Sequence, residues 1–249
     1  MIFFSTLFVY NYTRILHKKD VHTVNISQKS DWIFKHRFLI FIIVIGSAFG
    51  ILISLFNISK HTLLLLSPLF IVSILYATPI NLRRNSKIRL RQVPFLKVFL
   101  IAFVWTFVTY VLPLADYEST ASLSKLDITK FMSRFLFILA IALPFDIRDM
   151  ETDKRQGIKT LPTVIGEKRT KLLAIILLVL FCLLCVGQVL ISQEREQVKN
   201  VAYIVSGIVS IAMIALVDRN KNELFFSFWI EGLMLLQFIL LLLFRFVFL

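Results

Sequence analysis

Three aspartates at the end of an apolar segment stand in a pattern that suits a metal site. Asp146, Asp149 and Asp153 occupy positions i, i+3 and i+7, a spacing that places side chains along one face of a helix. Because 58% of the chain is apolar, a cluster of carboxylates here needs a specific reason. Carboxylate oxygens at a membrane surface suit Mg²⁺, which commonly takes a few carboxylates together with substrate phosphates. The pattern therefore predicts a site for magnesium and a phosphorylated substrate.

The same residues have a simpler interpretation as a charged, solvated loop. Arg148, Lys154 and Arg155 alternate with the acids and are close enough in sequence to pair with them. Runs of alternating charge usually do no more than this. The shared helical face of the three aspartates, and the Gly-Ile-Lys-Thr-Leu-Pro run at 157–162, favour the metal site over the loop.

The elements that must position these residues are transmembrane helices. The chain has 249 residues and a mean hydropathy of +0.82, and a helix needs about 20 apolar residues to cross a bilayer. We expect an all-α membrane protein, a polytopic helical bundle forming one domain over residues 1–249. Its hydrophobic runs give about eight candidate spans, at 2–16, 38–56, 62–78, 95–115, 131–146, 170–192, 200–217 and 224–248.

Basic residues gather on one side of this expected bundle. The net charge is +13, and 21 of the 28 lysines and arginines fall in the alternate loops 14–37, 83–97, 148–171 and 219–221. By the positive-inside rule these loops are cytoplasmic and both termini lie outside. A basic surface of this kind faces anionic lipid and anionic substrates, so no nucleic acid is expected as a partner. We predict a multi-pass protein of the inner or cell membrane, with its active face in the cytoplasm.

Two further segments reach the same membrane face as the aspartates. Asn11 and Arg14 lie at the end of the first span, and Tyr76 precedes a basic run that includes Arg83 and Arg84. A metal-bound diphosphate needs this mixture, because cations neutralise the remaining phosphate charge and arginine offers two parallel hydrogen bonds. The alternative for the basic run is a topology determinant that binds anionic lipid. For the first segment the alternative is ordinary residues at a span end.

These motifs resemble those of the UbiA superfamily of intramembrane prenyltransferases. The likeness rests on Asp149-x-x-x-Asp153 and on the run from Gly157 to Gly166, Gly-Ile-Lys-Thr-Leu-Pro-Thr-Val-Ile-Gly. They look like the family's second aspartate-rich motif and the run that follows it, and Asp146 fits the Asn or Asp often found just before. The basic run is similar to the family's second cytoplasmic basic loop, where Tyr and Lys or Arg contact diphosphate.

The chain differs from the family pattern in two ways. The family has nine spans, whereas about eight are expected here, so we expect the family's first helix to be missing. The family's first aspartate-rich motif is Asn-Asp-x-x-Asp-x-x-x-Asp. At the matching place this chain keeps the asparagine, Asn11, but has Tyr12, Ile15 and Lys19 where acids are expected. Half of the family's metal-binding set is therefore missing or changed.

The resemblance implies a cytoplasm-facing cavity in which Mg²⁺ holds a prenyl diphosphate, with transfer of the prenyl group to an aromatic or lipid-like acceptor. Asp149 and Asp153 would be catalytic and, with Asp146, would be the metal ligands. The implied substrate contacts come from all three segments: Asn11, Arg14, Tyr76, Arg83, Arg84 and Lys154.

Two other functions remain open on the sequence. The altered first motif favours a degenerate, non-catalytic family member that binds a prenyl lipid or acts as a membrane scaffold, whereas the retained second motif argues against it. A small-solute transporter would carry charged or Gly/Pro-broken stretches near mid-bilayer in paired segments, and the sequence shows no such pairing.

Overall fold

The computed structural model describes residues 1–16, 36–56, 58–59, 62–69, 79–83, 86–89, 96–117, 124–155 and 157–248. The chain divides into two compact units, Met1–Phe70 and Ile71–Leu249. Within the described ranges, 6 helices are long and apolar enough to cross a membrane: Arg37–Phe56, Leu96–Ala115, Lys125–Arg155, Glu167–Ile191, Glu196–Ala215 and Phe225–Val247.

The first unit is built around two helices, α1 (Ile2–Leu16) and α3 (Arg37–Phe56), which pack against each other. A Cβ atom added to Gly50 on α3 would lie 2.5 Å from the ring of Phe4 on α1. Lipid is as apolar as the helices themselves, so their association depends on close van der Waals packing at small residues. Gly50 is therefore the position that lets α1 approach α3.

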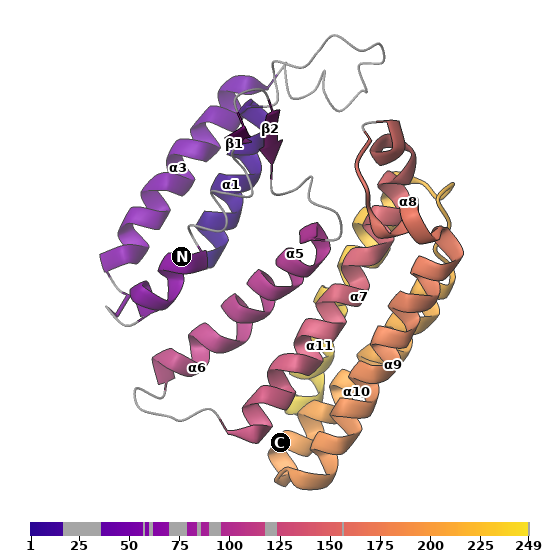
Figure 1. Cartoon of the computed structure of the whole chain (residues 1–249). Helices are drawn as coiled ribbons and strands as arrows, with labels where there is room; N and C mark the ends of the chain where they lie inside the picture. Colours follow the sequence, from indigo (N-terminus) through magenta and orange to yellow (C-terminus); the bar gives the residue numbers. More distant parts are fainter. Residues whose placement is uncertain are drawn as a thin grey trace. The chain divides into compact units, whose positions relative to one another are not determined.

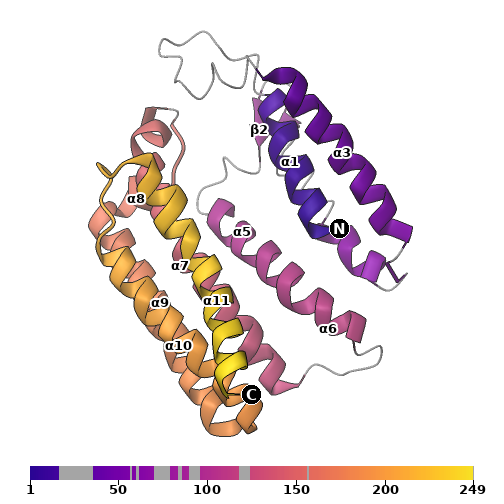
Figure 2. The same cartoon turned by 180° about the vertical axis from the view of Figure 1, so that it is seen from behind.

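The second unit is a helical bundle centred on α7, which contacts α5, α8, α9, α10 and η4. Figures 1 and 2 show α7, α9, α10 and α11 side by side, with α5 along another side of α7. Two short π-helical turns, η3 and η4, interrupt the spans that contain them. The elements are α5 (Leu96–Thr106), η3 (Phe107–Val111), α6 (Leu112–Tyr117), α7 (Lys125–Arg155), α8 (Leu161–Ile165), α9 (Glu167–Ile191), α10 (Glu194–Ala215), η4 (Phe225–Ile230) and α11 (Glu231–Phe248).

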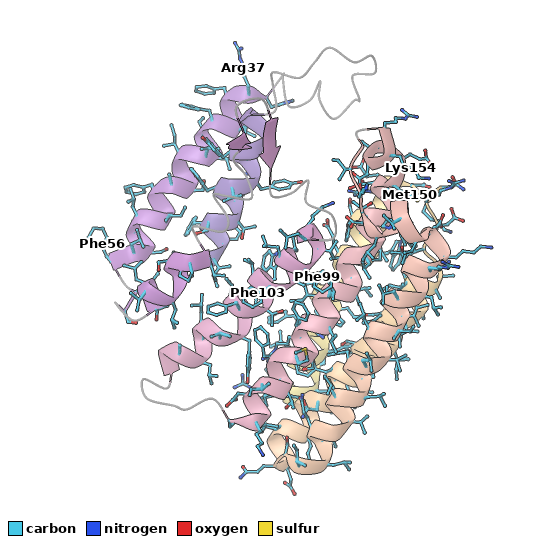
Figure 3. All side chains as sticks on the ribbon, in the orientation of Figure 1. Arg37, Phe56, Phe99, Phe103, Met150 and Lys154 are labelled. Atoms are coloured by element: carbon cyan, nitrogen blue, oxygen red, sulfur yellow. The ribbon has the colours of Figure 1, made fainter. Side chains whose placement is uncertain are left out.

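Aromatic side chains fill the contacts that α7 makes with its neighbours. Phe137 on α7 and Phe181 on α9 are almost fully buried, with ring centroids 5.0 Å apart. On the other side of α7, Phe99 and Phe103 of α5 face the helix (Figure 3). The ring centroids of Phe99 and Phe135 are 6.4 Å apart. Part of the chain's phenylalanine content is thus used to hold the central helix in place.

The structure confirms the expected all-α membrane bundle and refines the expected spans. Six of the eight predicted segments coincide with the helices of spanning length. The first predicted span, 2–16, is helical but shorter in its apolar part (Ile2–Tyr12) than a full span. The third, 62–78, is helical over 62–69 and otherwise lies outside the described residues.

A β-hairpin in the second predicted cytoplasmic loop was not expected. β1 (Pro79–Arg83) and β2 (Ser86–Arg89) pair antiparallel, with Ile80 opposite Ile88. Proline has no backbone N–H to donate to the ladder, and the first residue of a strand is one of the few positions where a strand tolerates it. The described part of the basic run, 79–83 and 86–89, is therefore a pair of strands and not an irregular loop.

Candidate functional site

All three aspartates lie on α7, which continues past the predicted end of its span. The helix runs to Arg155, with Lys154 and Arg155 in its last turn, where positive charge suits the negative end of the helix dipole. Pro144 lies inside the helix and is buried. Because proline cannot donate the usual backbone hydrogen bond, the regular ladder is interrupted just before Asp146.

The Gly-Ile-Lys-Thr-Leu-Pro run ends α7 and starts α8. Gly157 has φ of +68°, a conformation that glycine adopts at little cost, and the N–H of Ile158 bonds the carbonyl of Asp153 at 2.9 Å. Thr160 then caps α8 in a reciprocal arrangement with Thr163. The motif therefore has a structural role: it follows the end of α7, two residues after Asp153, and starts α8, which contacts α7.

Asp146 is buried against a cation from another helix. Its side chain is 3% exposed and accepts a hydrogen bond of 2.8 Å at Oδ1 from the Nζ of Lys97, near the start of α5. A buried carboxylate costs several kcal/mol unless it is paired and hydrogen-bonded. Lys97 supplies that pairing and ties α5 to α7 across 49 residues of sequence.

Asp153 is buried with part of its hydrogen-bonding capacity unused. The residue is 9% exposed, and its Oδ2 has no hydrogen-bond partner among the described residues. Thr160 and Lys97 lie near enough to interact with the carboxylate. Since an unpaired buried polar atom is costly, Asp153 is the aspartate with the most to gain from an additional positive ligand.

Asp149 lies at the edge of the same face and is paired at the surface. Its two oxygens accept hydrogen bonds from Nε and Nη2 of Arg148 at 2.8 and 3.2 Å, and its side chain is 36% exposed. The guanidinium of Arg148 also lies over the rings of Phe145 and Phe226, at 5.3 and 5.9 Å from their centroids. At this one position the alternative interpretation, pairing between neighbouring charges, describes the contact that is observed.

The aspartates do not form a ready-made metal cage. In the part of the chain that the structure describes, no group of three or more His, Cys, Asp or Glu side chains is placed to hold a metal ion. Mg²⁺ does not require one, because it usually keeps several waters and binds through one or two carboxylates plus substrate phosphates. The unpaired Oδ2 of Asp153 fits such a ligand. The assignment of all three aspartates as metal ligands stays a prediction.

The structure brings only some of the predicted substrate-binding residues into view. Lys154 is exposed in the last turn of α7, at the end next to α8 where Met150 also lies (Figure 3). Asn11 is buried in the first unit and donates from Nδ2 to the carbonyl of Leu7 at 2.8 Å, so its amide nitrogen serves its own helix. Arg14 lies in α1 and Arg83 in β1, but their side chains are outside the described set. Tyr76 and Arg84 lie wholly outside the described residues.

Sequence reasoning missed Lys97. It was counted only as one of the basic residues of a cytoplasmic loop, yet it is the ion-pair partner of Asp146 and interacts with Asp153. A weak signal was present, since Lys97 stands at the start of an apolar span whose first residues share the predicted membrane face of the aspartates. Nothing in the sequence says which of the cations on that face makes the contact.

Comparison with known proteins gives a family but no individual relative. No curated protein and no solved structure matches the chain. The sequence model of the UbiA prenyltransferase family matches residues 33–241, a range that includes the three aspartates and the run after them and excludes Asn11 and Arg14. With its membrane-spanning helices and a match over most of its length, the chain belongs to the UbiA prenyltransferase family and is an integral membrane protein.

Proposed function

We propose that this protein is a Mg²⁺-dependent transferase that moves a prenyl group from a prenyl diphosphate to an aromatic or lipid-like acceptor in the membrane. The observation that carries the proposal is the carboxylate of Asp153, which is buried at the end of α7 with one oxygen unpaired. It lies inside the segment matched to a prenyltransferase family. An acidic group left in this condition favours a cationic ligand.

In this proposal Asp149 and Asp153 are the catalytic carboxylates and, with Asp146, hold Mg²⁺. When bound, the metal would stabilise the charge on the departing diphosphate. Lys97 pairs with Asp146 in its buried position and so fixes the inner wall of the site. Release of Arg148 from Asp149 would free both carboxylate oxygens for the metal and a guanidinium fork for phosphate.

The other substrate contacts are assigned by family resemblance. In the proposal, cations and polar groups of all three predicted cytoplasmic segments contact the diphosphate, with the prenyl chain among apolar helices. The site would open to the cytoplasm, as the distribution of basic residues predicts. The residues are Asn11, Arg14, Tyr76, Arg83, Arg84 and Lys154.

The test is diphosphate release by the purified, detergent-solubilised protein. It is supplied with Mg²⁺, a panel of prenyl diphosphates and membrane extract as the source of acceptor. We expect release that stops when the metal is chelated and that is lost in Asp153→Asn. Glu151→Gln is the matched control, because Glu151 is an acid of the same helix whose side chain is 58% exposed and paired with Arg219. Equal release by wild type and Asp153→Asn would contradict the proposal.

A second function, a non-catalytic family member that binds a prenyl lipid or serves as a membrane scaffold, has one specific observation in its favour. Lys97 and Arg148 already partner Asp146 and Asp149, so much of the acidic cluster is stabilised without a metal. The altered first motif points the same way. Saturable binding of a prenyl diphosphate without diphosphate release, whatever acceptor is supplied, would support this second function.

A further inference from the structure

A polar cavity lies at the other end of the second unit, away from the aspartates. Its volume is about 320 Å³. Arg134 lines it and precedes Asp146 by 12 residues of α7, which corresponds to about 18 Å along a helix. The cavity is formed by the residues Tyr110, Leu114, Asp127, Lys130, Ser133, Arg134, Phe181, Gln188, Glu196, Lys199, Asn200 and Tyr203.

Arg134 is held in a fixed position in this cavity. Its guanidinium lies 4.2 Å from the ring centroid of Tyr110 and 5.8 Å from that of Tyr203, and Nη2 donates to the hydroxyl of Tyr203 at 3.2 Å. The other terminal nitrogen, Nη1, is buried and has no hydrogen-bond partner among the described residues. Tyr110 itself lies in η3, and π-helical turns of this kind are frequent at functional sites.

A second unpaired donor comes from α10. Asn200 is only 2% exposed, yet its Nδ2 lacks a hydrogen-bond partner within the described ranges. Beside it, Ser133 and Gln188 are also buried, and the Gln188 amide donates to the Ser133 hydroxyl at 3.5 Å. Buried donors without acceptors are rare in native proteins, and each is expected to have a water, an ion or a ligand.

The acidic groups of the cavity are already occupied. Asp127 accepts hydrogen bonds from the Tyr110 hydroxyl at 2.9 Å and from Ser124. Glu196 pairs with Lys130 at 3.0 Å and with Lys199 at 2.6 Å. Three cationic residues thus face two carboxylates, and the unpaired atoms, Nη1 of Arg134 and Nδ2 of Asn200, are both donors. A ligand that satisfies them must bring acceptor oxygens and tolerate one excess positive charge.

We propose that this cavity binds a phosphate group, with Arg134 and Asn200 as its principal donors. Arginine is the side chain best suited to phosphate oxygens, since its planar fork offers parallel hydrogen bonds. The cavity is at the lower end of the size range of small-molecule sites, so the ligand is compact. It is either a free phosphate-bearing anion or the head group of a phospholipid. The site shares no residue with the proposed transfer reaction and does not depend on it.

The experiment measures the thermal midpoint of the purified full-length protein in a zwitterionic or uncharged detergent. One arm titrates inorganic phosphate, and the other titrates a water-soluble short-chain phosphatidic acid. We expect at least one of them to raise Tm saturably, by about 3 °C or more near saturation. A shift with phosphatidic acid alone assigns a lipid head group, and a shift with inorganic phosphate assigns a free anion. No saturable shift in either arm overturns the proposal and leaves a cavity filled by water.

Two variants separate ligand binding from structure. Asn200→Leu replaces an unpaired buried amide by an apolar side chain of similar size, so Tm without ligand is expected to stay or rise while the apparent affinity falls about tenfold or more. Gln237→Leu is the matched control, because its amide bonds Ser206 at 3.2 Å outside the cavity. It should lower Tm and leave the ligand-induced shift intact. An unchanged shift in Asn200→Leu would contradict the assignment.

Discussion

Three aspartates on one helix differ at the residue scale because their neighbours differ. Asp146 is buried and paired with Lys97, Asp149 is paired at the surface with Arg148, and Asp153 is buried with one unpaired oxygen. Their spacing places all three on one face of the helix, so the spacing does not distinguish them. Their partners distinguish them, and Asp153 is the carboxylate with an unpaired oxygen available to a ligand.

Asp153→Asn should therefore stabilise the fold and abolish ligand binding at this position. The amide keeps the shape of the carboxylate and removes its buried negative charge, so we expect the free energy of unfolding to rise by about 1 kcal/mol. Any stabilisation of the wild type by Mg²⁺ with a prenyl diphosphate should disappear in the variant. Thermal unfolding with and without these ligands measures both effects, with Glu151→Gln as the exposed control. A variant less stable than the wild type would show that Asp153 is satisfied by the protein itself.

Lys97 and Asp146 should behave as one energetic unit. Lys97→Met leaves the carboxylate of Asp146 buried without its charge partner, which should cost about 3 kcal/mol of unfolding free energy. The double variant Lys97→Met/Asp146→Leu removes both charges and should recover most of that loss. A double-mutant cycle in denaturant measures the coupling. Additive effects of the two single substitutions would mean that the 2.8 Å contact contributes little.

The run between α7 and α8 has its role at the scale of elements, since Gly157 follows the end of one helix and Thr160 caps the start of the next. Gly157 has φ of +68°, and a Cβ atom there would meet no neighbour within 4 Å. The cost of any substitution is therefore one of backbone conformation and not of steric contact. An L-residue in this region costs about 1–2 kcal/mol.

Gly157→Ala is accordingly expected to lower the free energy of unfolding by about 1 kcal/mol, and Gly157→Asn by less, because asparagine tolerates the left-handed conformation. Gly187→Ala is the control: Gly187 lies within α9 with open space at its Cβ position, so alanine should be neutral or stabilising. Denaturant midpoints of the three variants give the ranking. Equal effects of Ala and Asn at position 157 would contradict this reading of the turn.

The sequence predicts the elements better than their contacts. Long apolar runs locate the spans because a bilayer demands about 20 such residues, and the i, i+3, i+7 spacing correctly places Asp146, Asp149 and Asp153 on a helix. The pair between Lys97 and Asp146 could not be predicted, because it depends on which faces of α5 and α7 meet. The polar cavity could not be predicted either, because each of its polar residues, taken alone in the sequence, is an isolated polar position in or near a span.

At the scale of the whole molecule, the orientation in the membrane decides which solution each site meets. Many of the exposed side chains on the long helices are large and apolar, as expected for surfaces that face lipid. The aspartates lie at one end of the second unit and the polar cavity at the other. The distribution of lysine and arginine predicts that the aspartate end is cytoplasmic and the cavity end outside. A substrate made in the cytoplasm would reach the first directly and the second only after crossing the membrane.

Cysteine labelling in intact cells tests this orientation. In a background with Cys182→Ser and Cys185→Ala, Gln193→Cys places a thiol at an exposed position before α10, and Lys168→Cys places one at an exposed position in the first turn of α9. A membrane-impermeant maleimide should label position 193 in intact cells and position 168 only after permeabilisation. Gln193 makes no side-chain cap to α10, so its replacement should not disturb the helix. The opposite labelling pattern would place the aspartates outside, where cytoplasmic prenyl diphosphate is absent, and would refute the proposed transfer reaction at that face.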